Sequence, residues 1–223
     1  NDWAWYQEHG IQLHVGCTVT EVDRMRRVVH GVDASGQTIS APYDRLVLAT
    51  GSNPFILPLP GHDLQGVLAY RDIADTQAMI DAATKYRHAV VIGGGLLGLE
   101  AANGLMKRGM QVTVVHASEW LMERQLDEVA GTMLQQSLAE RGLRFLMQAQ
   151  TQALVGDETQ GPGGRVRAVR FKDGSEVPAD LVVMAVGIRP NTALAQSMHL
   201  HVDRGIVVSD TLQTVTDPRI YAV

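Results

Sequence analysis

Residues 93–98 read GGGLLG, which is the spacing G-x-G-x-x-G. They follow a short apolar segment and open a segment with helical spacing, the context in which this pattern binds a dinucleotide. Gly93 would allow the sharp turn, Gly95 would let the backbone approach a pyrophosphate, and Gly98 would let the helix pack closely on the strand. The helix N-terminus would offer free N–H groups to the phosphates. The pattern therefore predicts a dinucleotide-binding turn, and a helix that merely packs tightly on the strand is the alternative.

The residue expected at the end of the second strand is His116, where this motif usually has an Asp or Glu for the adenosine ribose hydroxyls. A carboxylate would repel a 2′-phosphate, whereas an imidazole would not. Glu119 lies three positions further on and could still reach a ribose. The choice between NADH and NADPH therefore stays open, and His116 could equally be an exposed residue without a ligand.

Glu100 stands two positions after Gly98, and we expect it in the first turn of the helix. A carboxylate there interacts favourably with the helix dipole, which by itself requires no function. The same side chain could also reach the nicotinamide end of a dinucleotide.

Two strand ends elsewhere in the chain have the geometry of a cofactor crevice. Ala49, Thr50 and Gly51 end one apolar segment, and Gly187 follows another within residues 184–191. Each turn alone would be an ordinary loop. Two of them in one chain are more informative than one.

Composition excludes several other classes of function. Lys plus Arg number 19 and Asp plus Glu 24, and the net charge of −5 argues against nucleic acid as a partner. The single cysteine, Cys17, excludes a disulfide framework, a cysteine-built zinc site and a dithiol pair within this chain. The eight histidines have no cysteine or carboxylate at ligand spacing, so we expect no metal site. No apolar run approaches the roughly 20 residues of a membrane span.

Strand and helix patterns alternate around the glycine-rich turn. Strand patterns occur at 88–92, 111–115, 143–147 and 181–186, and helical patterns at 72–85, 96–108 and 127–141. This order predicts a parallel sheet with right-handed crossovers. The run at 181–186 is almost wholly apolar, which predicts a strand buried on both faces.

The segments on either side of this region contain short strand patterns and turns. Short strands are expected at 11–15, 18–22, 27–32 and 44–49, which indicates an antiparallel meander feeding one more strand. Residues 54–66 hold three prolines and two glycines and have linker composition. Later segments predict a hairpin loop at 156–164, a tight turn at Asp173-Gly174, and strands at 205–208 and 219–223.

Together these pieces resemble the pyridine nucleotide–disulfide oxidoreductase class, flavoproteins with two dinucleotide-binding domains. The resemblance rests on residues 46–54, 93–109 and 184–191, and it covers essentially the whole chain. It implies an α/β, Rossmann-like fold in which a parallel sheet with helices is joined to an antiparallel β-meander. In this class an inserted NAD(P)H domain splits the FAD domain in sequence, and hydride passes from nicotinamide to flavin.

This resemblance implies three segments: a partial FAD-binding domain at 1–69, an NAD(P)H-binding domain at 70–189, and the start of a second FAD segment at 190–223. The first FAD-binding glycine motif of the class is not found before residue 46, and the chain does not begin with Met. We therefore expect a fragment of a longer enzyme, inactive by itself.

The resemblance also implies roles for individual residues. Those expected to hold the NAD(P)H pyrophosphate are Gly93, Gly95, Leu96, Leu97 and Gly98. His116 would lie near the adenosine ribose, and Glu100 and Gly187 would flank the nicotinamide, with Glu100 as the side chain at the reaction centre. FAD would contact Ala49, Thr50 and Gly51, and more weakly Arg71.

A narrower resemblance, to the large subunits of assimilatory NAD(P)H-dependent nitrite reductases, rests on residues 114–116 and 121–127 (LMERQLD). It implies electron transfer onward to reduce nitrite to ammonia, with sirohaem and an iron–sulfur cluster in a later part of the parent chain. The expected partners are a pyridine nucleotide and the other domains of that chain. No signal peptide is visible, so we expect a cytoplasmic location.

Two alternatives stay open. The parent could be an NAD(P)H-dependent ferredoxin or rubredoxin reductase, because these proteins share most of the same motifs. A non-catalytic dinucleotide-binding sensor module is an alternative of another class.

Overall fold

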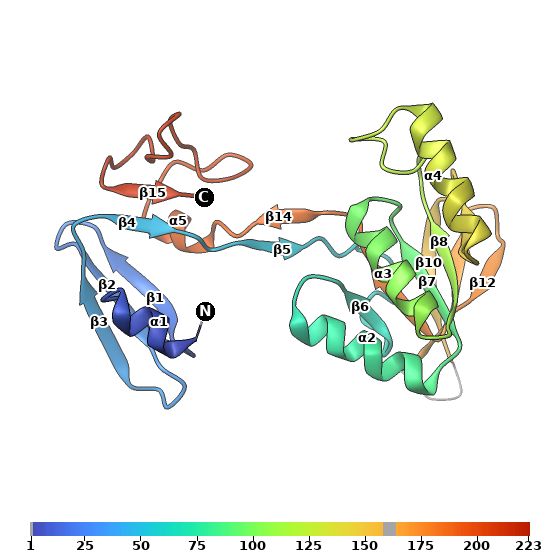
Figure 1. Cartoon of the computed structure of the whole chain (residues 1–223), viewed down its shortest axis with the longest axis horizontal. Coiled ribbons are helices and arrows are strands. Elements are labelled where there is room, and N and C mark those ends of the chain that lie inside the picture. The colour runs from blue at the N-terminus through green and yellow to red at the C-terminus, as the bar shows by residue number, and fades with distance from the viewer. Residues whose placement is uncertain (1, 158–163) are drawn as a thin grey trace. The chain divides into compact units, whose positions relative to one another are not determined.

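The computed structural model describes residues 2–157 and 164–223, and Figure 1 labels its helices and strands. The chain forms two compact units. The central unit is Asn53–Ile188, and the flanking unit combines Asn1–Ser52 with Arg189–Val223. The chain changes unit within two short strands, β5 (Ser52–Pro54) and β14 (Ile188–Pro190), which pair with each other. In sequence, therefore, the central unit is an insertion in the flanking one.

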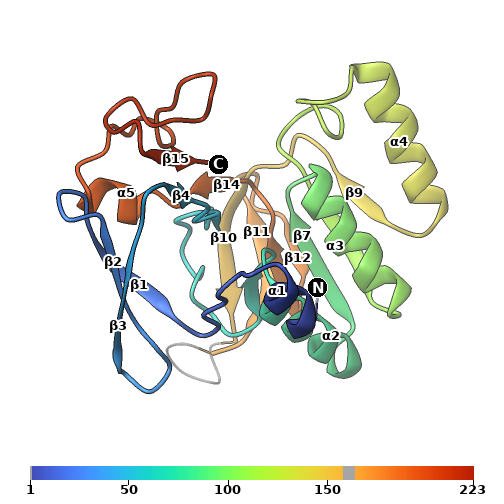
Figure 2. The ribbon, with the colours of Figure 1, turned by 60° about the vertical axis from the view of Figure 1, so that its left-hand side comes forward.

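A five-stranded sheet, in which each neighbouring pair is parallel, forms the middle of the central unit. Its strands, in spatial order, are β6 (Val67–Ala69), β13 (Leu181–Met184), β7 (His88–Ile92), β8 (Gln111–Val115) and β9 (Arg144–Leu146). The helices of this unit are α2 (Ile73–Lys85), α3 (Leu96–Lys107) and α4 (Glu128–Glu140). Figure 2 shows α3 lying along β7, as the predicted strand–turn–helix order requires.

A second, antiparallel sheet belongs to the same unit. It consists of β10 (Thr151–Gly156), β11 (Val166–Phe171) and β12 (Glu176–Pro178). The predicted turn before β12 is confirmed: Gly174 has φ +86°, and its N–H donates to the carbonyl of Phe171 at 3.0 Å. The loop predicted at 156–164 lies mostly outside the described residues.

The parallel strands separate two cores, because successive side chains of a strand point to opposite faces. Val91 of β7 packs in one cluster with Ala102 and Leu105 of α3. Its neighbour Val90 packs in another cluster with Val169 of β11. These five side chains are at most 1% exposed, and burying one such aliphatic side chain is worth roughly 1.5–3 kcal/mol. Burial on both faces explains why β13 and residues 89–92 of β7 read as continuous apolar runs.

The flanking unit contains an antiparallel meander of β1 (Thr18–Asp23), β2 (Val28–Val32) and β3 (Thr38–Pro42). A separate parallel pair joins β4 (Leu46–Leu48) to β15 (Ile220–Ala222), which connects the segment before the central unit to the segment after it. Two short helices, α1 (Trp3–Glu8) and α5 (Ala193–Ser197), complete the unit. No helix among the described residues is both long and apolar enough to cross a membrane.

Two predicted strands do not form. Residues 11–15 are not in a strand, and Ile11, Leu13 and Val15 are 43%, 39% and 66% exposed. Among the described residues, no strand pairs with this segment. Residues 205–208 contribute only isolated bridges, at Ile206 and Val208.

The first boundary between units lies at residue 53, whereas the sequence placed it at residue 70. The segment in question is rich in proline but also apolar. Leu57 and Leu64 pack against the buried cluster around Val90, and β6 extends the parallel sheet beside β13. Residues 54–69 therefore belong to the central unit by packing.

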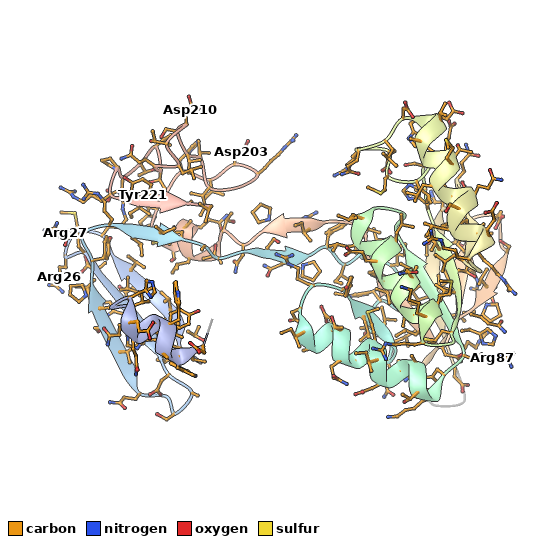
Figure 3. The ribbon with its side chains drawn as sticks, in the orientation of Figure 1. Arg26, Arg27, Arg87, Asp203, Asp210 and Tyr221 are labelled. Carbon is orange, nitrogen blue, oxygen red and sulfur yellow. The ribbon has the colours of Figure 1, made fainter. Side chains whose placement is uncertain are left out.

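Asp180 joins the starts of β7 and β13. Its Oδ2 accepts hydrogen bonds from the backbone N–H groups of Arg87 at 3.1 Å and His88 at 2.8 Å, and lies 3.3 Å from His88 Nδ1. Arg87 is labelled in Figure 3 at the edge of the central unit. Burial alone would raise the pKa of Asp180, but these hydrogen bonds outweigh it and hold the pKa below its ordinary value.

We predict that Asp180→Asn lowers the free energy of unfolding by about 1 kcal/mol at pH 7, a figure discounted because the side chain is 38% exposed. Since the folded-state pKa is depressed, this stabilisation is present above the unfolded-state pKa of about 3.9 and is lost as the pH falls through the folded-state value. Urea unfolding at pH 7 and at pH 3 measures it. A difference between wild type and variant that is equally large at both pH values would contradict the assignment.

Candidate dinucleotide-binding site

The glycine-rich turn lies between the end of β7 and the start of α3. Gly93 has φ +119°, and its N–H donates to the carbonyl of Val115 at 2.8 Å. A Cβ on Gly93 would overlap the carbonyl oxygen of Ala185, which follows β13. A Cβ on Gly98 would in turn overlap the carbonyl oxygen of Gly93. The close packing predicted for the first and last glycines is therefore present.

Gly95 differs from those two glycines, because its position is open. No atom lies within 4 Å of the place that a Cβ would occupy. Gly95 is also the N-cap of α3 and supplies no side-chain hydrogen bond, whereas Asp72 and Asp127 cap α2 and α4. The first N–H groups of α3 are thus left to an outside acceptor, and the helix dipole favours an anion there.

A pocket of about 610 Å³ opens over this helix end, within the central unit. Its volume is in the range of small-molecule and cofactor sites. The residues around it are Leu57, Leu59, Ile92, Gly93, Gly94, Gly95, Leu96, Leu97, Val115, His116, Ala117, Ser118, Glu123, Arg124, Gln125, Ala149, Gln150, Thr151, Lys172, Ala185, Val186, Gly187 and Ile188. The wall is mostly apolar, with a few charged side chains.

The pocket brings together six of the predicted site residues: Gly93, Gly95, Leu96, Leu97, His116 and Gly187. Gly98 is buried behind it and supports the turn instead. Gly187 has φ +123°, and its carbonyl accepts from the N–H of Phe55 at 2.9 Å. The end of β13 therefore contributes to the same pocket as the end of β7.

His116 has a different environment from the one predicted. Its side chain is not an exposed strand end, since the residue is only 8% exposed. Nδ1 accepts a hydrogen bond from the N–H of Gly94 at 3.1 Å. Nε2 lies 3.0 Å from Glu123 Oε2 and 3.1 Å from the carbonyl oxygen of Trp120. The ring thus holds the middle of the glycine-rich turn.

Two predicted carboxylates lie outside the pocket. Glu119 is exposed, and its Oε1 accepts from Gln148 Nε2 at 3.2 Å. Glu100 is also exposed; α3 begins at Leu96 and has no acidic residue in its first turn, so the prediction that placed Glu100 in that turn is wrong. Arg71 lies before α2, and its backbone N–H donates to Asp75. The proposed roles of Glu100 and Arg71 at the cofactors stay predictions. The predicted reach of Glu119 to the ribose is not supported, because Gln148 holds its carboxylate outside the pocket.

Three of the predicted FAD contacts, Ala49, Thr50 and Gly51, are in the flanking unit, whereas Arg71 belongs to the central unit. Ala49 is exposed, and Gly51 has φ +65° with no atom near its missing Cβ. The Thr50 hydroxyl donates to the carbonyl of Asn191 at 2.7 Å, and the N–H of Asn191 donates to the carbonyl of Gly51 at 2.9 Å. The Thr50 side chain therefore joins two segments of this unit.

Sequence reasoning missed several pocket residues. Leu57 and Leu59 belong to the segment interpreted as a linker, although apolar residues among its prolines were a usable signal. Glu123 and Lys172 also line the pocket. Glu123 lies within residues 121–127, which carried the narrower resemblance without marking a site residue, and no motif marks Lys172. Only the folding of the chain back onto the turn brings them to the pocket.

Comparison with known proteins agrees with this geometry. The family model described as pyridine nucleotide-disulphide oxidoreductase matches residues 5–223. The chain belongs to this family. Its α/β, Rossmann-like fold is confirmed by a solved relative, the ferredoxin reductase of Rhodopseudomonas palustris. That structure has a TM-score of 0.89 and 30% identity, over all of this chain and 52% of its own.

Two curated relatives point in the same direction. The chain is 53% identical over its full length to the nitrite reductase (NAD(P)H) of Bacillus subtilis (strain 168), of which it covers 26%. It is 45% identical to the assimilatory nitrate reductase electron transfer subunit of the same organism and covers 28% of that protein. The chain thus spans little more than a quarter of these relatives.

Two glycines of α3 provide a matched test of the turn. Gly98→Ala places a Cβ on the Gly93 carbonyl, so we predict a loss of about 1–3 kcal/mol in the free energy of unfolding. Gly104→Ala meets no atom within 4 Å and removes a helix-interior glycine, so it should gain up to about 1 kcal/mol. Denaturant unfolding measures both variants. Equal stabilisation by the two would show that Gly98 is not closely packed.

Proposed function

We propose that the central unit binds NAD(P)H and that the chain is part of an oxidoreductase passing hydride from this nucleotide to FAD. The observation that carries the proposal is the uncapped N-terminus of α3, open at Gly95 onto a pocket of about 610 Å³. The pyrophosphate would accept hydrogen bonds from the N–H groups of Gly95, Leu96 and Leu97. Apolar side chains such as Leu57 and Ile92 would exclude water from the pocket.

FAD, when bound, supplies the acceptor for the hydride. Family membership supports its presence, and the turn at residues 49–51 fits it in part. Gly51 offers open backbone, whereas the Thr50 hydroxyl already donates to Asn191. The backbone of Ala49 and Gly51 would therefore contact the flavin nucleotide. Glu100 and Gly187 would act at the nicotinamide by orienting it rather than by covalent chemistry.

For the electrons beyond FAD, we propose nitrite as the acceptor, with reduction to ammonia. The 53% identity to a nitrite reductase over the full chain supports this choice. Sirohaem and an iron–sulfur cluster would then belong to further domains of the parent protein, which would be the partners of this chain in a cytoplasmic enzyme.

A second candidate, an NAD(P)H-dependent reductase of a ferredoxin, is favoured by the structural similarity to a ferredoxin reductase. The two differ in the acceptor that NAD(P)H-derived electrons reduce, so assays of the parent protein with nitrite and with ferredoxin separate them. A non-catalytic sensor would bind the nucleotide without oxidising it, so reduction of ferricyanide by NAD(P)H in the parent protein would exclude this alternative.

We predict that Gly95→Val weakens nucleotide binding at least about tenfold, because its side chain would fill the space that the pyrophosphate needs. The backbone at Gly95 is extended, with φ −84° and ψ −176°, which valine also adopts, so the fold should persist. Calorimetric titration with NADH and NADPH measures binding, and unfolding curves verify the fold. Gly104→Ala is the control on the same helix. A folded Gly95→Val variant with wild-type affinity would contradict the site.

A further inference from the structure

The hydrogen bonds of His116 determine its tautomer. A backbone N–H can only donate, so Nδ1, which receives the N–H of Gly94, carries no proton. In the neutral ring the proton is then on Nε2, which donates toward Glu123 Oε2 at 3.0 Å and the carbonyl of Trp120 at 3.1 Å. His116 thus connects the turn on one side to a carboxylate on the other.

Glu123 places a carboxylate close to the end of β8, although the residue at the strand end itself is a histidine. Dinucleotide sites of this type use an acidic side chain at the end of the second strand to bind the adenosine ribose hydroxyls. Here His116 occupies the position directly after β8, and Glu123 lies against its ring. The Glu123 side chain is 35% exposed and borders the pocket beside Ala117 and Ser118. One carboxylate oxygen accepts from His116, while the other accepts from no group among the described residues.

We propose that Glu123, oriented by His116, takes the role of the absent strand-end carboxylate and makes the site selective for NADH over NADPH. Its free oxygen accepts from the ribose hydroxyls of NADH, and its charge repels the 2′-phosphate of NADPH. His116 is a positioning residue that acts through Glu123 and Gly94. The inference rests on the proposed function, since it assumes that a pyridine nucleotide occupies this pocket.

Two cations, Arg124 and Lys172, also border the pocket. Both nucleotides carry the same pyrophosphate, so cations that neutralise it favour neither. Only a charge near the 2′ position distinguishes the two nucleotides. Glu123 has a defined hydrogen-bond partner, His116, which holds its carboxylate beside the end of β8.

The test is the ratio of the dissociation constants of NADPH and NADH, measured by titration of the 223-residue chain. We expect wild type to bind NADH at least about tenfold more tightly, and Glu123→Gln to reduce this ratio by about tenfold. Glu119→Gln is the matched control: it removes the same charge from the same loop, but its carboxylate is held by Gln148 outside the pocket. It should leave the ratio unchanged.

Two substitutions of His116 separate positioning from folding. His116→Gln keeps a donor near the place of Nε2, so it should retain most of the selectivity. His116→Asn keeps an acceptor near the place of Nδ1 for Gly94 but is too short to reach Glu123, so it should lose the selectivity. The opposite order would overturn the positioning role.

The remaining outcomes are also decisive. A wild-type preference for NADPH that disappears in Arg124→Gln would overturn the inference and make the arginine the discriminating residue. If Glu123→Gln and Glu119→Gln lowered the ratio of the dissociation constants equally, the preference would come from the net charge of the loop. That result would overturn the specific role of Glu123. If the wild-type chain binds neither nucleotide, the proposed function itself fails. If it binds both and Glu123→Gln leaves the ratio unchanged, only the inference fails.

Discussion

The close approach of three backbone segments determines the candidate site. Gly98 packs on the carbonyl of Gly93, and Gly93 packs on the carbonyl of Ala185, with no room for a Cβ at either contact. The first contact sets the distance between α3 and β7, and the second places the end of β13 beside the turn. Since a helix leaves its first N–H groups without partners, fixing the start of α3 also fixes where an anion can bind.

A second set of contacts holds the middle of the same turn. The N–H of Gly94 donates to His116, and the carbonyl of Gly94 accepts from the N–H of Met122 at 3.1 Å. Both backbone polar groups of Gly94 are therefore bonded to the segment that follows β8. This segment also contains Glu123, so the geometry of the glycine-rich turn and that of the charged end of the pocket depend on each other. These hydrogen bonds explain why a histidine is buried at this strand end, whether or not a ligand binds.

Features that depend on neighbouring residues could be predicted from the sequence. The order of strand, glycine turn and helix around Gly93 is of this kind, and so is the turn at Gly174. Features that depend on distant contacts could not be predicted. Glu119 and Glu123 lie on one loop with similar chemistry, and their hydrogen-bond partners, Gln148 and His116, distinguish them. Likewise, residues 11–15 alternate like a strand but lack a partner, whereas the proline-rich segment around Leu57 packs into the core.

The pocket lining supplies few reactive side chains, so the chemistry would come mainly from the bound molecule. Its wall combines apolar side chains, such as Leu57, Ile92 and Val115, with backbone groups of the turn and a few charges. Such a wall can orient a nucleotide and keep water away from it. Neither effect depends on which molecule finally accepts the electrons. Relatives of different names can therefore share this unit: a nitrite reductase and a ferredoxin reductase both match the whole chain, over about a quarter and about half of their own lengths. If a pyridine nucleotide occupies this pocket as proposed, the contribution of this unit is the choice of nucleotide, and the charged side chains beside the end of β8 are the candidates for making that choice.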